Sequence, residues 1–262
     1  MGPATQASWL EQFRKQVPRL SFADKTLPCQ PVLRLNFDGD DRAFHAALYE
    51  TLVNAAGLRS PVEEFDIKES EDVTIAEMAS VPMALRFLEI LVRLTRPRRV
   101  LEIGTFIGIS AMTMARALPA GGHLTTLEVS PRFAALARDN FRRNGLERAI
   151  TLVEGKALDA LRTFDPARPF DLIFLDADKD HYSAYFPRLD ALLAEGGLLI
   201  IDDVLFHGDV LNEAPKTSKG VGAKALLKLV QAQSHYRSVL LPLSTGMLLM
   251  VKETSLSKRP GG

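Results

Sequence analysis

From Arg99 onward, short apolar segments alternate regularly with stretches of helical periodicity. The apolar segments are RVLEIG, HLTTLEV, AITLVEG, FDLIFLDA and GLLIIDDV, and the helical stretches between them cover residues 108–118, 131–144, 156–163 and 181–194. This alternation predicts an α/β fold, a parallel sheet covered by helices on both faces. A helix at about 221–234 and a closing pair of strands, YRSVLL and MLLMVKE, complete an expected seven-stranded sheet whose last strand is antiparallel.

The first seventy residues differ from this regular region. Their amphipathic stretches are broken by prolines, and the clearest of them, residues 41–56, places Phe44, Leu48 and Leu52 on one helical stripe. A second helical segment, residues 75–94, is expected to be interrupted near Pro82. We therefore expect a helical N-terminal appendage over residues 1–70, a main α/β domain over residues 71–253 and a flexible tail over residues 254–262.

Composition limits the class of protein and the kind of partner. The chain has 262 residues, of which 47% are hydrophobic, enough to bury one large core. Its 32 acidic and 32 basic residues cancel, so no overall field favours nucleic acid or an anionic membrane. A single cysteine, Cys29, fits a reducing compartment, and no apolar run approaches the roughly 18 residues of a membrane span. We expect a soluble cytoplasmic protein with a small-molecule partner.

Charged side chains follow two of the predicted strands at the point where each strand ends. Asp176, Asp178 and Lys179 follow FDLIFL, while Asp202 and Asp203 follow GLLII. Neighbouring strands lie about 4.8 Å apart, so acids at two adjacent strand ends can share one cation. The DADK motif alone is equally consistent with solvated loop residues. Two adjacent carboxylates at a mostly buried edge, however, are costly without a counter-ion and favour a metal site.

The turn after the first strand, LEIGTFIGIS, indicates a ligand site. Gly104 and Gly108 stand where the backbone must turn tightly and let a ligand approach the next helix. Their spacing is not the GxGxxG of dinucleotide enzymes, so the ligand need not contain a pyrophosphate. Glu128 ends the second strand, where an acid can accept hydrogen bonds from both ribose hydroxyls. An ordinary polar residue at the end of a strand would give the same pattern.

In combination, these segments resemble the cation-dependent class I S-adenosylmethionine (SAM) O-methyltransferases, the family related to caffeoyl-CoA and catechol O-methyltransferases. The resemblance spans roughly residues 80–253, and its most specific elements are DADKDHY and the later IIDD. It implies a Rossmann-like fold with extra N-terminal helices that shape the acceptor pocket and a homodimer contact. The implied activity is SAM-dependent and divalent-cation-dependent methylation of a hydroxyl on a small catechol-like or phenolic secondary metabolite.

The resemblance also implies roles for individual residues. Lys179 matches the family's catalytic lysine and would act beside Asp176, while the metal ligands would be Asp176, Asp202 and Asp203. Glu128 would hold the ribose and Ala157 would border the adenine. The residues expected around SAM are Ser80, Glu102, Gly104, Thr105, Ser110, Glu128, Ala157, Asp176 and Asp178.

The chemistry supports a metal independently of the family name. Methyl transfer from a sulfonium needs an oxygen nucleophile held in line, preferably as its anion. Carboxylates favour hard ions, so we expect Mg²⁺, with Ca²⁺ or Mn²⁺ as alternatives. Lys179 could accept the proton or stabilise the oxyanion, and the sequence leaves both roles open.

Three positions near the expected site carry open interpretations. Relatives usually have asparagine where this chain has Asp203, so the additional charge should strengthen cation binding or change the metal preference. His207 stands where plant relatives carry an asparagine thought to contact substrate, which makes it a candidate acceptor residue. The polar, glycine-rich segment 208–224 is either a mobile lid or a solvated connector.

Two other functions remain consistent with the sequence. Some bacterial relatives with this core methylate a wobble uridine of tRNA, which the balanced charge of this chain disfavours and a clustered basic face would favour. A non-catalytic SAM-binding protein would have no need of Asp176, Lys179, Asp202 and Asp203 together. We therefore expect an O-methyltransferase acting on a small molecule.

Overall fold

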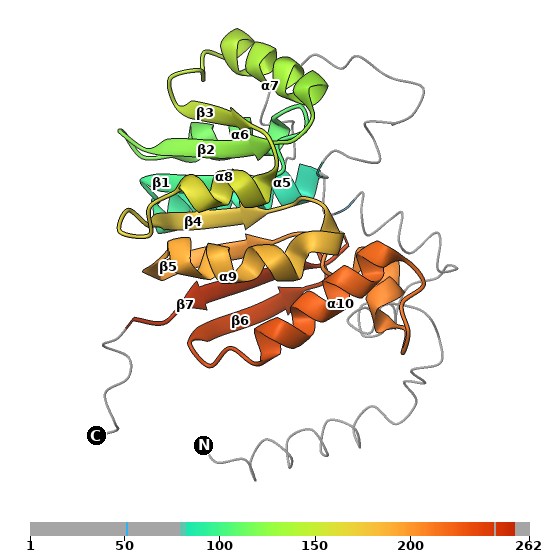
Figure 1. Cartoon of the computed structure of the whole chain (residues 1–262). Coiled ribbons are helices and arrows are strands. Elements are labelled where there is room, and N and C mark those ends of the chain that lie inside the picture. Colours follow the sequence, from blue (N-terminus) through green and yellow to red (C-terminus); the bar gives the residue numbers. More distant parts are fainter. Residues whose placement is uncertain (1–50, 52–79, 81, 244, 255–262) are drawn as a thin grey trace, which may run out of the picture. The chain divides into compact units, whose positions relative to one another are not determined.

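The computed structural model describes residues 51, 80, 82–243 and 245–254 (Figure 1). All of these except Thr51 belong to one compact unit, Leu58–Gly262. The predicted appendage over residues 1–70 and the predicted tail over residues 254–262 lie, apart from Thr51 and Thr254, outside the described residues. The same holds for the helical stripe predicted at residues 41–56.

Seven strands form one mixed sheet, as predicted. Their order across the sheet is β3-β2-β1-β4-β5-β7-β6. The five strands from β3 to β5 pair in parallel, and β7 is antiparallel to both of its neighbours. The strands are β1 (Arg99–Ile103), β2 (His123–Glu128), β3 (Ile150–Glu154), β4 (Phe170–Leu175), β5 (Leu193–Ile201), β6 (Tyr236–Leu241) and β7 (Met247–Lys252).

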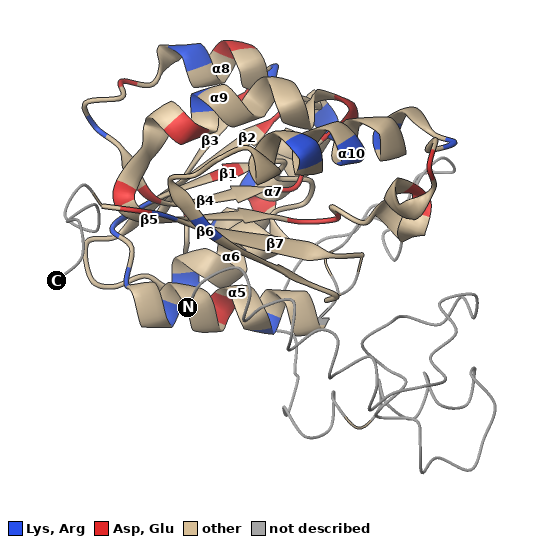
Figure 2. Cartoon of the chain, turned by 90° about the horizontal axis from the view of Figure 1, so that it is seen from below, with Lys and Arg blue, Asp and Glu red and all other residues tan. Residues whose placement is uncertain are grey.

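Helices cover both faces of this sheet, and each face has its own apolar core. One core lies under α5 (Pro82–Thr95), α6 (Ile109–Ala117) and α7 (Pro131–Arg143). The other lies under α8 (Ala157–Thr163), α9 (Tyr182–Leu192) and α10 (Ser218–Gln231). Figure 2 shows α8, α9 and α10 above the strands and α5 and α6 below them. Alternate strand residues feed the two cores, because successive side chains of a strand point to opposite faces.

Several element boundaries differ from the predicted ones for local reasons. The helix predicted at about 221 begins at Ser218, because the Thr217 hydroxyl accepts a hydrogen bond from Gly220 N at 2.9 Å and caps the first turn. Leu193 starts β5 instead of ending a helix, because it pairs with Phe170 of β4. Pro82 is the first residue of α5, a position where its missing N–H costs nothing, and the earlier part of the segment predicted at 75–94 lies, apart from Ser80, outside the described residues.

Strand register places several loops at one edge of the sheet. Ile103 of β1 pairs with Leu175 of β4, and Leu175 pairs in turn with Ile201 of β5. The residues that follow these three, Gly104, Asp176 and Asp202, therefore leave the sheet at the same level. We refer to this side as the carboxyl edge, and to the opposite side, where the parallel strands begin, as the amino edge.

Candidate active site

Backbone hydrogen bonds hold the strand exits of the carboxyl edge together. Asp176 N donates to Ile103 O at 2.9 Å, and Asp202 N donates to Leu175 O at 3.0 Å. Each bond extends the ladder by one residue past the last paired position, so the side chains that follow start from fixed points. The convergence of Asp176 and Asp202 expected from their strands is thus present in the structure.

Lys179 lies between two of the carboxylates. Its Nζ is 3.1 Å from Asp176 Oδ1 and 3.0 Å from Asp203 Oδ2, and its side chain is only 12% exposed. The turn that carries it is a short 3₁₀ helix, η1 (Lys179–His181), between β4 and α9. Burial disfavours the ammonium charge, but Asp176 and Asp203 outweigh this, so the pKa of Lys179 lies above its ordinary value.

Asp202 is the most deeply buried acid of the cluster. It is 6% exposed, and burial, together with the charges of Asp176 and Asp203, raises its pKa to about 7. A backbone hydrogen bond from Asp203 N to Asp202 Oδ1, at 2.8 Å, opposes this rise. Lys179 also opposes it, but incompletely. The edge therefore holds more negative charge than one ammonium neutralises.

Asp203 has an unusual backbone and an unpaired oxygen. Its φ is 59°, a left-handed conformation that aspartate and asparagine tolerate better than other residues with a side chain. This preference gives a physical reason for an aspartate at this position. Its Oδ2 contacts Lys179, while its Oδ1 is buried without a hydrogen-bond partner among the described residues. A buried unpaired carboxylate oxygen is costly and calls for a ligand.

The donor set fits a hard divalent cation in its chemistry. Three carboxylates share the edge, one buried oxygen has no partner among the described residues, and burial together with the charges of Asp176 and Asp203 raises the pKa of Asp202. Within the described ranges, however, no three acidic, histidine or cysteine side chains are arranged closely enough to bind one ion. Binding would require these side chains to turn toward one another and Lys179 to give up part of its contact.

The glycine loop after β1 passes directly against this cluster. Gly104 has a φ of 97°, and a Cβ there would lie 2.0 Å from the backbone oxygen of Asp176. Gly108 has a φ of 87°, and a Cβ there would meet the ring of Phe141 at 2.4 Å. Both glycines are therefore required by space as well as by backbone conformation. The predicted ligand loop and the predicted acidic edge adjoin each other.

Glu102 is buried within a group of hydroxyls. Its carboxyl accepts from Ser110 Oγ at 2.6 Å and from the Thr126 hydroxyl, which also bonds to Thr105. Burial raises the pKa of Glu102 to about 8, although the bonds from Ser110 and Thr126 lower it. Thr126 was not among the predicted residues. Its place on β2, paired with Glu102 in the register, is set by long-range strand pairing.

Glu128 is turned toward the same loop. Its carboxylate accepts from Phe106 N at 2.7 Å, from Thr105 N at 3.3 Å and from Ser130 N at 2.8 Å. The side chain is 7% exposed. Glu128 thus fixes the glycine loop to the end of β2, and a ribose would have to share this carboxylate with the backbone.

Asp178 belongs to a network that the sequence analysis missed. It accepts from the hydroxyl of Tyr185 at 2.5 Å and also pairs with the imidazole of His181. Burial and the bond to Asp178 raise the pKa of Tyr185 above its ordinary value. Tyr182 begins α9 and is fully buried, and its hydroxyl donates to Asp202 O at 3.1 Å. Asp178 precedes η1 and lies outside α9, so helical spacing in the sequence does not predict its contact with Tyr185.

Three further predicted residues lie around this edge. Ala157 is the first residue of α8 and packs partly buried against the core under that helix. His207 is exposed, with a left-handed φ of 51°, in the kinked 3₁₀ segment η2 (Phe206–Leu211), and its ring packs edge-on against Phe206. Ser80 is half-buried and lies two residues before α5.

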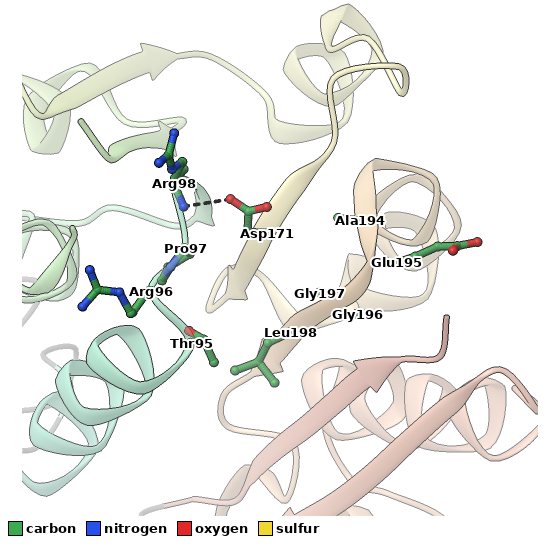
Figure 3. Close-up of a pocket in the computed structure, with 10 residues that line it drawn as sticks. All are labelled: Thr95, Arg96, Pro97, Arg98, Asp171, Ala194, Glu195, Gly196, Gly197 and Leu198. Atoms are coloured by element: carbon green, nitrogen blue, oxygen red, sulfur yellow. Dashed lines mark hydrogen bonds between the residues drawn. The ribbon is translucent and has the colours of Figure 1, made fainter. Parts of the chain in front are cut away.

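A hollow of about 360 Å³ lies at the opposite, amino edge (Figure 3). Its lining includes Asp171 and residues Ala194 to Leu198 of β5, and contains none of the predicted site residues. Asp171 already accepts hydrogen bonds from Arg98 N at 2.8 Å and Arg99 N at 2.9 Å. In Figure 3 the long side chains of Arg96, Arg98 and Glu195 point away from the centre of the hollow. It is not the candidate active site.

Comparison with known proteins identifies the family. The family model described as O-methyltransferase matches residues 59–253. The chain belongs to the O-methyltransferase family. A catechol O-methyltransferase from Niastella koreensis is 38% identical over 158 residues, which are 60% of this chain and 72% of that protein. A catechol O-methyltransferase from Mycobacterium tuberculosis is 37% identical over 145 residues, which are 55% of this chain and 65% of that protein.

A solved structure agrees with the observed fold. The O-methyltransferase from Bacillus cereus, in complex with SAH, is 27% identical with a TM-score of 0.64, covering 86% of this chain and 97% of that chain. The predicted Rossmann-like methyltransferase fold is confirmed, and this chain is an O-methyltransferase enzyme. Among the described residues, no helix is long and apolar enough to cross a membrane.

Proposed function

We propose that this O-methyltransferase transfers the methyl group of SAM to a hydroxyl of a small catechol-like or phenolic acceptor, with the help of a divalent cation. The observation that carries the proposal is the carboxyl edge, where Lys179 lies between Asp176 and Asp203 and one carboxylate oxygen has no partner. Two relatives named catechol O-methyltransferase and the SAH held by the Bacillus cereus enzyme support the acceptor class and the methyl donor.

The methyl donor is proposed to bind across the exits of β1 and β2. Gly104 and Gly108 let this loop pack closely against Asp176 and Phe141, and Glu128 orients the loop. The Ser110 and Thr126 hydroxyls donate to the buried carboxyl of Glu102 behind the loop, and Thr105 bonds to Thr126. Ser80, Ala157, Asp176 and Asp178 complete the proposed binding set around this region.

The cation is proposed to bind Asp176, Asp202 and Asp203. When bound, a divalent ion supplies Lewis acidity that lowers the pKa of vicinal hydroxyls and orients them. Carboxylate oxygens suit hard ions, so Mg²⁺ is the proposed cation and Ca²⁺ or Mn²⁺ would be alternatives. The support comes from the unpaired Asp203 Oδ1 and from the pKa of Asp202, which burial and its acidic neighbours raise.

Lys179 is proposed to be the catalytic residue beside the acceptor oxygen. Its ammonium form is favoured by Asp176 and Asp203, so in this arrangement it presents a positive charge that stabilises a developing oxyanion. The centroid of the fully buried Tyr182 ring lies 5.8 Å from Lys179 Nζ, and the ring shields one side of the ammonium from water. His207, exposed within η2, is proposed to contact the far end of the acceptor.

The proposal is tested by methyl transfer from SAM to caffeic acid, with and without EDTA, followed by addition of Mg²⁺, Ca²⁺ or Mn²⁺. Turnover that EDTA abolishes and metal restores is the expected result. Turnover that EDTA leaves unchanged would remove the cation from the mechanism. Activity on tRNA that carries a modified wobble uridine, in place of caffeic acid, would favour the alternative, a wobble-uridine methyltransferase. Sedimentation velocity tests the proposed homodimer separately.

A further inference from the structure

The first turns of α10 pack against the turn that carries Lys179. This helix contacts both η1 and α9, and Figure 1 shows α10 beside α9. At the closest point, Gly222 faces the backbone of η1. A Cβ at Gly222 would lie 2.2 Å from Lys179 O and 2.9 Å from Asp180 Cα. Those atoms are backbone, so they cannot move aside as the end of a flexible side chain can.

The carbonyl that Gly222 faces also holds the turn together. Lys179 O accepts the hydrogen bond from Tyr182 N that closes η1. A side chain at position 222 would push on this oxygen, and the rest of the residue would move with it. The Lys179 Nζ contacts at 3.1 Å and 3.0 Å leave little room for such a movement.

The start of α10 is itself fixed, so it cannot simply tilt away. Asp209 accepts hydrogen bonds from Lys216 N at 2.8 Å, Thr217 N at 2.9 Å and Asn212 Nδ2 at 3.0 Å. A Cβ at Gly220 would lie 2.1 Å from Asp209 Oδ2, so this loop packs against the first turn of the helix. Of the segment 208–224, expected as either a mobile lid or a solvated connector, residues 208–211 belong to η2 and residues 218–224 to α10. Asp209 ties the residues between them to the start of α10.

We propose that Gly222 is a positioning residue for Lys179, because its missing side chain lets α10 support the backbone of η1 and so fixes where the ammonium lies. This inference rests on the proposed catalytic role of Lys179. Glycine is unfavourable in the interior of a helix relative to alanine, so its presence in the second turn of α10 requires a compensating reason. The close approach to Lys179 O is that reason.

The test compares Gly222→Ala with Val221→Ala. Val221 is the preceding residue of α10 and is 53% exposed, so its substitution controls for changes in the helix itself. With SAM, caffeic acid and Mg²⁺, we expect kcat of Gly222→Ala to fall about tenfold or more, since small displacements of catalytic groups are costly. KM for SAM should stay within about twofold, and Val221→Ala should match the parent enzyme. An unchanged kcat in Gly222→Ala would overturn the inference.

A second measurement needs no acceptor. Amide hydrogen exchange of the segment 176–182 should become faster in Gly222→Ala than in Val221→Ala, while the strand segments keep their protection. If exchange in this segment is unchanged, or if the whole domain loses protection together, Gly222 does not position the turn.

Lys179→Met separates this inference from the proposed function. If Lys179→Met keeps the parent kcat, the catalytic role of Lys179 is wrong, whatever Gly222→Ala does. If Lys179→Met is slow and Gly222→Ala is not, the proposed function stands and the positioning role is wrong.

Discussion

The two edges of the sheet use the same kinds of charged residue in opposite ways. At the amino edge, Asp190 accepts hydrogen bonds from Tyr236 at 2.8 Å and His235 at 3.1 Å, and pairs with Lys252 at 3.2 Å. Burial disfavours the charged form of Asp190, but its hydrogen bonds and the charge of Lys252 outweigh burial, so the pKa of Asp190 is lowered. At the carboxyl edge, the pKa of Asp202 is raised instead.

The difference lies in how completely each carboxylate is paired. The amino-edge group joins the end of α9 to β6 and β7, and its charges balance within the structure. The carboxyl-edge group leaves Asp203 Oδ1 buried and unpaired, on a left-handed backbone. Backbone strain and unpaired charge of this kind are common where a protein binds ligands. The comparison therefore contrasts an amino edge whose charges stabilise the fold with a carboxyl edge that is the proposed ligand-binding site.

The largest expected effect comes from replacing one lysine with methionine at each edge of the sheet. Lys179→Met should lower kcat by about 10²-fold or more, because the charge beside the acceptor oxygen is lost, with SAM affinity nearly unchanged. Lys252→Met, the matched variant, should leave kcat within about twofold of the parent. It should reduce the free energy of unfolding by about 1–3 kcal/mol, because Asp190 O loses the hydrogen bond that Lys252 Nζ donates to it at 2.6 Å. Steady-state kinetics and urea unfolding of both variants check this prediction. Loss of kcat in Lys252→Met with an unchanged kcat in Lys179→Met would contradict the comparison.

Asp203→Asn should change the Mg²⁺ concentration that the enzyme requires more than it changes kcat. Asparagine tolerates the left-handed backbone at this position, so the fold should be retained. Removing one negative charge should raise the Mg²⁺ concentration that gives half-maximal activity about tenfold, with kcat at saturating Mg²⁺ within a few-fold of the parent. An unchanged Mg²⁺ dependence would show that Asp203 is not a ligand.

Asp190→Asn should destabilise the enzyme by about 1–2 kcal/mol at pH 7 without affecting kcat. Because the folded pKa of Asp190 is lowered below 3.8, its contribution is present above that value and is lost as pH falls through the folded pKa. Unfolding free energies measured between pH 7 and pH 3 should therefore converge for the parent and the variant. Parallel curves over this range would contradict the assignment.

Glu102→Gln tests the buried carboxyl behind the glycine loop, where the expected effect is smallest. The folded pKa is raised from 4.5 to about 8, so the contribution of Glu102 is fully present below pH 4.5 and is lost as pH rises through 8. The parent should lose at least about 1 kcal/mol of stability between pH 5 and pH 9 relative to the variant. Urea titrations across this range check the sign, and a parent that gains stability relative to the variant would refute it.

The local sequence pattern was enough to predict the architecture and the meeting of two strand ends at the carboxyl edge. Strand and helix periods predicted the sheet, and the position of Asp176 and Asp202 directly after apolar strands predicted their meeting, because register follows from the parallel pairing.

The finer geometry depends on contacts between distant parts of the chain. Nothing near Gly222 in the sequence shows that it faces Lys179 O, and nothing near Asp203 shows that one oxygen would lack a partner. The side-chain cap at Thr217 moved the start of α10 three residues from the predicted position. Such features arise when α10, η1 and the glycine loop pack, and no single segment encodes them.

Direct titration of Mn²⁺ tests the central claim that the carboxyl edge is the unbalanced, cation-binding edge. Free Mn²⁺ would be followed by electron paramagnetic resonance in the parent enzyme, in Asp202→Asn and in Asp190→Asn. We predict one ion per chain in the parent and in Asp190→Asn, and affinity at least about tenfold weaker in Asp202→Asn. Binding that is equal in all three proteins, or absent from the parent, would contradict the account.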